Sequence, residues 1–139
     1  MKRTQYRIQP QTREALARRL AEELEKEPTI QFGYLYGSVL DSDTVHDVDV
    51  GLYLCEPEAA TSSATSIDLS IRLTAIVGMP VDVRVLNEAP LSFMYHVLRG
   101  RLLAYRDEEC LTETLEDVAR RYLDLEPLLR QGTKDAFAA

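Results

Sequence analysis

The sequence predicts a single α/β domain in which helices flank a mixed β-sheet of three to four strands. Segments with helical and with strand periodicity alternate along the 139 residues, and no linker rich in Pro, Gly or Ser separates two halves. A chain of this length has room for one compact domain. We expect its core to span about residues 12–127 and a polar tail to occupy residues 128–139.

The first third of the chain predicts one helix and one buried strand. Leucines and alanines recur at helical spacing over residues 12–27, where Thr12 is placed to cap the helix and Pro28 to end it. Aromatic and aliphatic residues then occupy residues 30–36, a pattern typical of a buried strand. This strand must turn at Gly37, which needs no side-chain room.

A second strand follows a polar loop that has room for a short helix. Residues 47–54 alternate strictly between two faces. Valines and leucines fall on one face, whereas Asp47 and Asp49 fall on the other. The strand therefore presents two carboxylates on the side opposite its apolar residues.

The middle of the chain predicts a helix and a third strand. Small residues and isoleucines at helical steps favour a helix over residues 60–77, closed by Gly78. The strand at residues 81–86 has its valines on the inner face, with Asp82 and Arg84 on the outer face. An acidic outer face therefore recurs on this strand.

The last third predicts a short helix, an edge strand and a long helix. The short helix covers residues 90–98, and residues 101–106 add a fourth strand at the edge of the sheet. Asp107 is placed to cap a long amphipathic helix that we expect to end near Pro127.

The charge distribution excludes one class of ligand and favours another. Sixteen Lys and Arg against 23 Asp and Glu give a net charge of -7, whereas binding to long nucleic acid depends on clustered basic groups. No basic residue lies between Lys26 and Arg72. We therefore expect no long nucleic acid as a ligand, and we expect this acidic middle segment to attract cations.

Cysteine usage and hydropathy point to the cytoplasm. Cys55 and Cys110 lie far apart and match no metal or redox spacing, so we expect two ordinary thiols in a reducing compartment. The N-terminal residues carry charges every few positions and no signal-peptide stretch, and no later segment approaches a membrane span. We expect neither export nor membrane anchoring.

Three features converge on one metal site. Gly37 and Ser38 end the first strand, Asp47 and Asp49 share a face of the second, and Asp82 faces outward from the third. Neighbouring strands lie about 4.8 Å apart, so the three carboxylates can meet. Their mutual repulsion is relieved by a divalent cation, and Mg²⁺ prefers oxygen ligands and completes its shell with substrate phosphates.

The expected substrate is therefore a nucleoside triphosphate. Two metal ions would assist phosphoryl or nucleotidyl transfer. One would activate the attacking hydroxyl, and the other would neutralise charge on the leaving pyrophosphate. We expect Asp47 and Asp49 to bridge them and Asp82 to complete the ion nearest the nucleophile. Arg84 and Arg72 are candidates for phosphate contacts, although an ion pair between Arg84 and a carboxylate is equally compatible with the sequence.

The segment GSVLDSDTVHDVDV from residue 37 to 50, with VDVRVL from residue 81, resembles the active-site pattern of the DNA polymerase β-type nucleotidyltransferases. The smallest branch, the minimal nucleotidyltransferase (MNT) family, is most similar. This resemblance implies a nucleotidyltransferase-type sheet, a triphosphate held by Gly37 and Ser38, and Mg²⁺ bound by Asp47, Asp49 and Asp82. It also implies an antitoxin that pairs with a HEPN-domain toxin and transfers AMP from ATP to a tyrosine of that toxin.

Two features differ from the family pattern. Eight residues separate Ser38 from Asp47, where the family usually has about ten, and this loop lacks the basic residue that often follows the Gly-Ser pair. Two alternatives stay open. One is a module that neutralises the toxin by binding alone, and the other is a small-molecule nucleotidyltransferase, whose usual extra helical domain is missing here.

Overall fold

One mixed sheet organises the molecule. The computed structural model describes residues 4–56 and 58–137, and within them four strands form a sheet in the order β5-β4-β2-β6. Strands β4 and β5 are parallel, whereas β2 is antiparallel to both β4 and β6. The predicted α/β fold with a mixed sheet flanked by helices is therefore confirmed, and β6 is the fourth strand, at an edge.

Helices and strands alternate along most of the chain, as the periodicity predicts. Their bounds are β1 Tyr6–Arg7, α1 Pro10–Glu25, β2 Ile30–Tyr36, α2 Ser38–Asp41, β3 Thr44–Val45, β4 Val48–Leu54, α3 Ala59–Val77, β5 Val81–Val85, α4 Leu91–Leu98, β6 Arg101–Tyr105 and α5 Glu108–Phe137.

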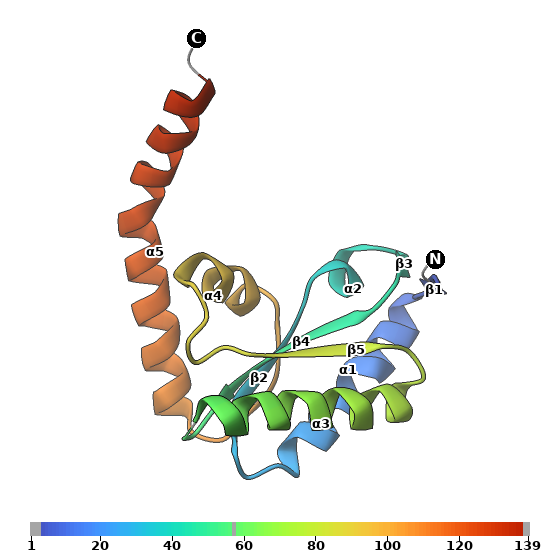
Figure 1. Ribbon diagram of the computed structural model, residues 1–139. Coiled ribbons are helices and arrows are strands. Elements are labelled where there is room, and N and C mark those ends of the chain that lie inside the picture. The colour runs from blue at the N-terminus through green and yellow to red at the C-terminus, as the bar shows by residue number, and fades with distance from the viewer. Residues whose placement is uncertain (1–3, 57, 138–139) are drawn as a thin grey trace.

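Helices cover both faces of the sheet (Figure 1). Helices α1 and α3 pack on one face, against the valines and leucines of β4 and β5. Helices α4 and α5 pack on the other face, against Phe32, Tyr34 and Tyr36 of β2. The two apolar clusters leave the polar residues of β4 and β5 on the α4 side.

Strand β4 shows why the alternation predicts burial so well. Val48, Val50 and Leu52 are fully buried in the cluster beneath α1 and α3. On the opposite face, a side chain at Gly51 would lie 2.7 Å from a methyl group of Val97 in α4. Glycine therefore lets α4 approach β4 closely, just beyond the carboxylate of Asp49.

The start of α1 differs from the prediction. The helix begins at Pro10, and Gln9 takes the N-cap position without a side-chain hydrogen bond. Proline suits the first helical position because its φ angle is already helical and no N–H is needed there. Thr12 therefore lies inside the helix and does not cap it, and the helix ends at Glu25, two residues before the predicted end.

The last helix is longer than predicted. Helix α5 continues through Pro127 to Phe137, so most of the expected polar tail at residues 128–139 is helical, and its last two residues lie outside the described chain. Proline in a helix removes one hydrogen bond but does not force the chain to leave the helix. Figure 1 shows the C-terminal turns of α5 extending beyond the sheet.

The polar loop after β2 contains short elements. Helix α2 covers Ser38–Asp41, as the room in the loop allows, and β3 then pairs antiparallel with β1 near the N-terminus. Strands β1 and β3 have two residues each, too few to show a period. This pairing places the loop between β2 and β4 against the start of α1, where Arg13 donates to the carbonyl oxygens of Val39 and Ser42.

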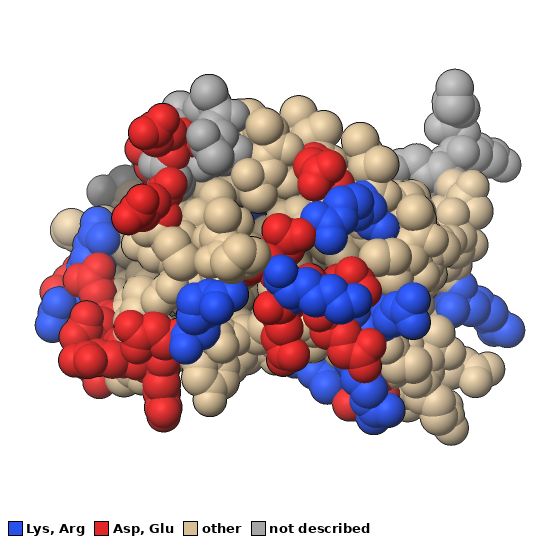
Figure 2. Space-filling model, turned by 90° about the horizontal axis from the view of Figure 1, so that it is seen from below, with Lys and Arg blue, Asp and Glu red and all other residues tan. Residues whose placement is uncertain are grey.

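The surface formed by α1 and α3 has mixed charge. Figure 2 shows acidic and basic side chains interspersed on this face without a continuous basic patch. In the part of the chain that the structure describes, no helix is long and apolar enough to cross a membrane.

Candidate functional site

A row of polar residues crosses the sheet at one level. Asp49 of β4 is the register partner of Asp82 on β5 and of Tyr36 on β2. Register partners on neighbouring strands point to the same face, with their strands about 4.8 Å apart. Asp47 lies just before β4, which begins one residue later than predicted, and its charge contributes to raising the pKa of Tyr36. The register thus places Asp49 and Asp82 on one side of the sheet, and that Asp47 joins them in one metal site stays a prediction.

This shared side is the face covered by α4. Val48 and Val50, the neighbours of Asp49 in sequence, belong to the apolar cluster beneath α1 and α3. Tyr36 packs instead with residues of α4, its ring meeting that of Phe93 edge-on with centroids 5.8 Å apart. Asp49 and Asp82 therefore lie at the edge of the α4 layer, where both are partly exposed.

Gly37 touches this row directly. Its φ angle of +83° lies in a region that L side chains rarely adopt. A Cβ at Gly37 would lie 2.6 Å from the Oδ2 atom of Asp49. The turn after β2 thus brings bare backbone against the DxD carboxylate, and Ser38 follows as the exposed first residue of α2.

The two arginine candidates have different environments. The Nε atom of Arg84 lies 3.3 Å from the Oδ2 atom of Asp82, and this hydrogen bond raises the pKa of the guanidinium. The ion pair that the sequence left open is therefore present in the structure. Arg72 lies on α3, beneath the opposite face of the sheet, where it pairs with Glu27 and Asp68. It is too remote to contact phosphates at the carboxylate row, so that expectation is wrong.

Tyr36 is a site residue that the sequence analysis missed. Burial is the first cause that raises its pKa to about 12, and the carboxylates of Asp49, Asp82 and Asp47 raise it as well. The phenolic hydroxyl of Tyr36 is therefore close enough to the three acidic groups for their charges to act on it. The signal available in the sequence was its position, immediately before the glycine turn and at the end of a strand.

The pKa of Tyr36 makes stability depend on alkaline pH. A tyrosine in the unfolded chain ionises near pH 10, about two units below the value in the folded protein. Between about pH 10 and about pH 12, Tyr36 is therefore protonated in the folded protein and ionised in the unfolded chain. The free energy of unfolding falls as the pH rises through this range. Below it, the contribution of Tyr36 is fully present.

We expect Tyr36→Phe to remove this contribution. Urea unfolding of both proteins at about pH 9 and about pH 11 should show a smaller loss of stability in the variant, by at most about 2 kcal/mol. All other tyrosines are shared, so the difference between the two proteins isolates Tyr36. Equal losses in both proteins would contradict the assignment.

The acidic row suits Mg²⁺ in the chemistry of its donors. Asp47, Asp49 and Asp82 supply only carboxylate oxygens, the ligands that this ion prefers, and the bare backbone at Gly37 leaves room beside them. Among the described residues, however, no three acidic, His or Cys side chains already stand in a metal-holding group. The ion pair with Arg84 gives one physical reason, because it holds one oxygen of Asp82.

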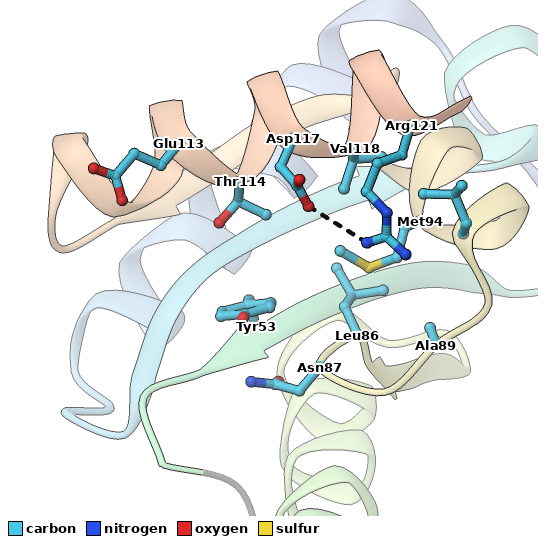
Figure 3. Close-up of a pocket in the computed structure, with 11 residues that line it drawn as sticks. Tyr53, Leu86, Asn87, Ala89, Met94, Glu113, Thr114, Asp117, Val118 and Arg121 are labelled. Atoms are coloured by element: carbon cyan, nitrogen blue, oxygen red, sulfur yellow. Dashed lines mark hydrogen bonds and ion pairs between the residues drawn. The ribbon is translucent and has the colours of Figure 1, made fainter. Parts of the chain in front are cut away.

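A cavity of about 280 Å³ lies between the sheet and α5 (Figure 3). Four of its polar side chains are bonded within the protein. Asn87 exchanges two hydrogen bonds of 2.8 Å with the backbone of the last residue of β4, and Thr114 donates to a carbonyl of its own helix. Asp117 pairs with Arg121 at 3.4 Å. These contacts lie either within α5 or between Asn87 and β4, and we assign the cavity no part in the chemistry.

The fold and the site together define the class of the protein. A Gly-Ser turn, a DxD strand and a third carboxylate on the adjacent parallel strand form the arrangement expected of a nucleotidyltransferase domain. The chain belongs to the family described as Polymerase beta, Nucleotidyltransferase, which matches residues 18–109. The match includes every predicted site residue. No curated protein matches the chain.

Solved structures place the fold more narrowly. The chain is similar to one from a complex of a tri-AMPylated HEPN toxin with its MNT antitoxin from Shewanella oneidensis, with a TM-score of 0.69, 16% identity and coverage of 91% of this chain and 99% of the other. The chain is also similar to one from a toxin-antitoxin complex of MntA and HepT, with a TM-score of 0.68 and 16% identity. The match covers 90% of this chain and 99% of the other. A chain from a toxin-antitoxin structure with AMP-PNP matches with a TM-score of 0.70 and 17% identity. That match covers 88% of this chain and 98% of the other. The predicted similarity to MNT antitoxins is therefore confirmed for the fold.

Proposed function

We propose that this protein is a Mg²⁺-dependent nucleotidyltransferase antitoxin that transfers AMP from ATP to a hydroxyl, expected to be a tyrosine, of a HEPN-domain toxin in the cytoplasm. The observation that carries the proposal is the register of Asp49 with Asp82 on one face, directly beside the glycine turn at Gly37. The similarity to antitoxin structures, including one with a tri-AMPylated toxin, supports the choice of partner and of transferred group.

The transfer exchanges one phosphorus–oxygen bond for another. The hydroxyl oxygen of the acceptor bonds to the α-phosphorus of ATP while the bond from that phosphorus to the bridging oxygen of the β-phosphate breaks, and pyrophosphate leaves with the bonding electrons. Asp82 accepts the hydroxyl proton as general base. Two Mg²⁺ ions, when bound, would favour the hydroxyl's ionisation and neutralise charge on the pyrophosphate.

Each residue of the site has its own part in this reaction. Asp47 and Asp49 would hold both ions, and Asp82 would hold the ion nearest the acceptor. Gly37 lets its backbone approach the triphosphate, and Ser38 adds a hydroxyl donor. Arg84, which holds Asp82 at 3.3 Å, is placed to exchange this contact for a phosphate oxygen. A protein supplies the acceptor, since a domain of this size buries much of its apolar surface merely to fold.

The ion pair between Arg84 and Asp82 favours one alternative, in which the protein neutralises the toxin by binding alone. If Arg84 keeps Asp82 away from the metal, the protein neutralises its toxin by contact alone. The experiment that separates these functions incubates the chain with its purified partner, Mg²⁺ and ATP labelled on either the α- or the γ-phosphate. We expect the partner to keep label from α-labelled ATP only. Label from γ-labelled ATP, or no label in an assay in which the complex forms, would contradict AMP transfer.

A further inference from the structure

A cavity of about 350 Å³ opens beside the turn at Gly37. It is bordered by Tyr36 and Gly37 at the end of β2, by Asp41 of α2, and by His96 and Arg99 at the end of α4. Figure 1 shows α2 and α4 on the same side of the sheet. Tyr36 and Gly37 border both this cavity and the carboxylate row, so a molecule bound at that row lies next to the cavity.

Arg99 supplies a fixed positive charge at this cavity. Its guanidinium carbon lies 5.6 Å from the ring centroid of Tyr95, and that ring stacks on Tyr122 of α5 with centroids 3.8 Å apart. Arg99 forms no ion pair with any carboxylate whose side chain the structure describes. The aromatic pair therefore positions an exposed guanidinium whose hydrogen-bond donors are not occupied by any of the described carboxylates.

The other arginines near the site are already engaged. Arg84 is bonded to Asp82, and Arg72 pairs with Glu27 on the far face of the sheet. The segment of residues 38–46, which leads from the glycine turn to the DxD strand, contains no Lys or Arg. Arg84 reaches a phosphate only by giving up Asp82, so an additional positive charge for a polyphosphate at the turn comes from α4, the neighbouring element that offers one.

We propose that Arg99 binds the β- and γ-phosphates of the nucleotide. This inference rests on the proposed AMP transfer, in which the α-phosphorus stays at the carboxylate row. The leaving pyrophosphate then extends past Gly37 into the cavity, where the guanidinium and the ring of His96 meet its oxygens. Asp41 adds one negative charge at the rim, and this charge opposes phosphate binding.

The test measures nucleotide binding by the full chain, without the partner. Dissociation constants of ATP, ADP and AMP with Mg²⁺ are determined by titration calorimetry for the wild type and for Arg99→Gln. We expect the variant to bind ATP at least about ten-fold more weakly, the loss expected for one charged hydrogen bond, and to bind AMP unchanged. Arg99→Lys, which keeps the charge, should retain most of the affinity.

Two further variants serve as controls. Arg18→Gln removes an exposed charge from α1, on the other face of the sheet, and should leave every constant unchanged. Asp41→Asn removes the opposing charge and should tighten ATP binding or leave it as it is. Weaker ATP binding by Asp41→Asn would contradict the proposed path of the phosphates.

The outcomes separate this inference from the proposed function. ATP binding that Arg99→Gln leaves unchanged overturns the role of Arg99, while AMP transfer stands. Equal weakening of ATP and AMP places the guanidinium at the nucleoside and also overturns it. A wild-type chain that binds no ATP with Mg²⁺ overturns both proposals.

Discussion

Asp49→Asn is expected to lower AMP transfer to the partner by about 100-fold or more, the size of effect found when one preorganised charged or polar group is removed from an active site. Asp49 is the centre of the row, since it is in register with both Asp82 and Tyr36 and touches the Gly37 turn. Asparagine has almost the same shape but lacks the charge that binds a metal ion. The label retained by the partner from α-labelled ATP measures the loss.

The matched control is Asp117→Asn. Asp117 is a half-exposed carboxylate on α5 that pairs with Arg120 and Arg121, away from the row. Its replacement removes the same charge and should leave transfer at the wild-type level. Circular dichroism on both variants checks that the fold is retained. Full transfer by Asp49→Asn would overturn the metal-binding role of the DxD pair.

Growth of cells that express the toxin adds a second measurement on the same variant. If Asp49→Asn no longer transfers label and no longer relieves toxicity, neutralisation depends on the chemistry. If it relieves toxicity fully, the protein acts through contact, and the nucleotidyltransferase site is not needed for protection. The two results therefore choose between the proposed function and its alternative.

The sequence could predict the parts of the site that depend on strand periodicity. Alternation along β4 and β5 places Asp49 and Asp82 opposite the buried valines, and the glycine after β2 marks the turn, because these patterns follow from local geometry. The order of strands adds what the pattern alone cannot. Only the pairing of β4 with both β2 and β5 brings Tyr36 into the row.

Features that arise from long-range contacts could not be read from the chain. Arg84 and Asp82 form a hydrogen bond in the structure. Each of these side chains has several other possible partners in the sequence, and the sequence alone does not indicate which one it contacts. The exposed guanidinium of Arg99 depends on how α4 and α5 stack their tyrosines. The predicted end of α5 near Pro127 is wrong for a local reason. Proline often ends a helix, but here the helix continues through Pro127.

Gly37→Ala tests whether the turn and the carboxylate form one unit, and Gly78→Ala is its matched control. Both glycines have a positive φ angle, +83° and +80°, so alanine is strained at each. At Gly78 nothing lies within 4 Å of the added carbon, whereas at Gly37 the Oδ2 atom of Asp49 lies at 2.6 Å. Each variant should lose about 1–2 kcal/mol of unfolding free energy from backbone strain.

Only Gly37→Ala should also lose activity, because its methyl group must displace the carboxylate of Asp49. A shift of about 1 Å in a reacting group is enough to lower a rate about 100-fold. Transfer assays at a temperature where both variants are folded, beside urea unfolding of each, separate strain from displacement. Equal transfer by the two alanine variants would mean that the contact between Gly37 and Asp49 has no catalytic consequence. A loss confined to Gly37→Ala would mean that the close approach of this backbone to Asp49 sets the position of the metal-binding carboxylate.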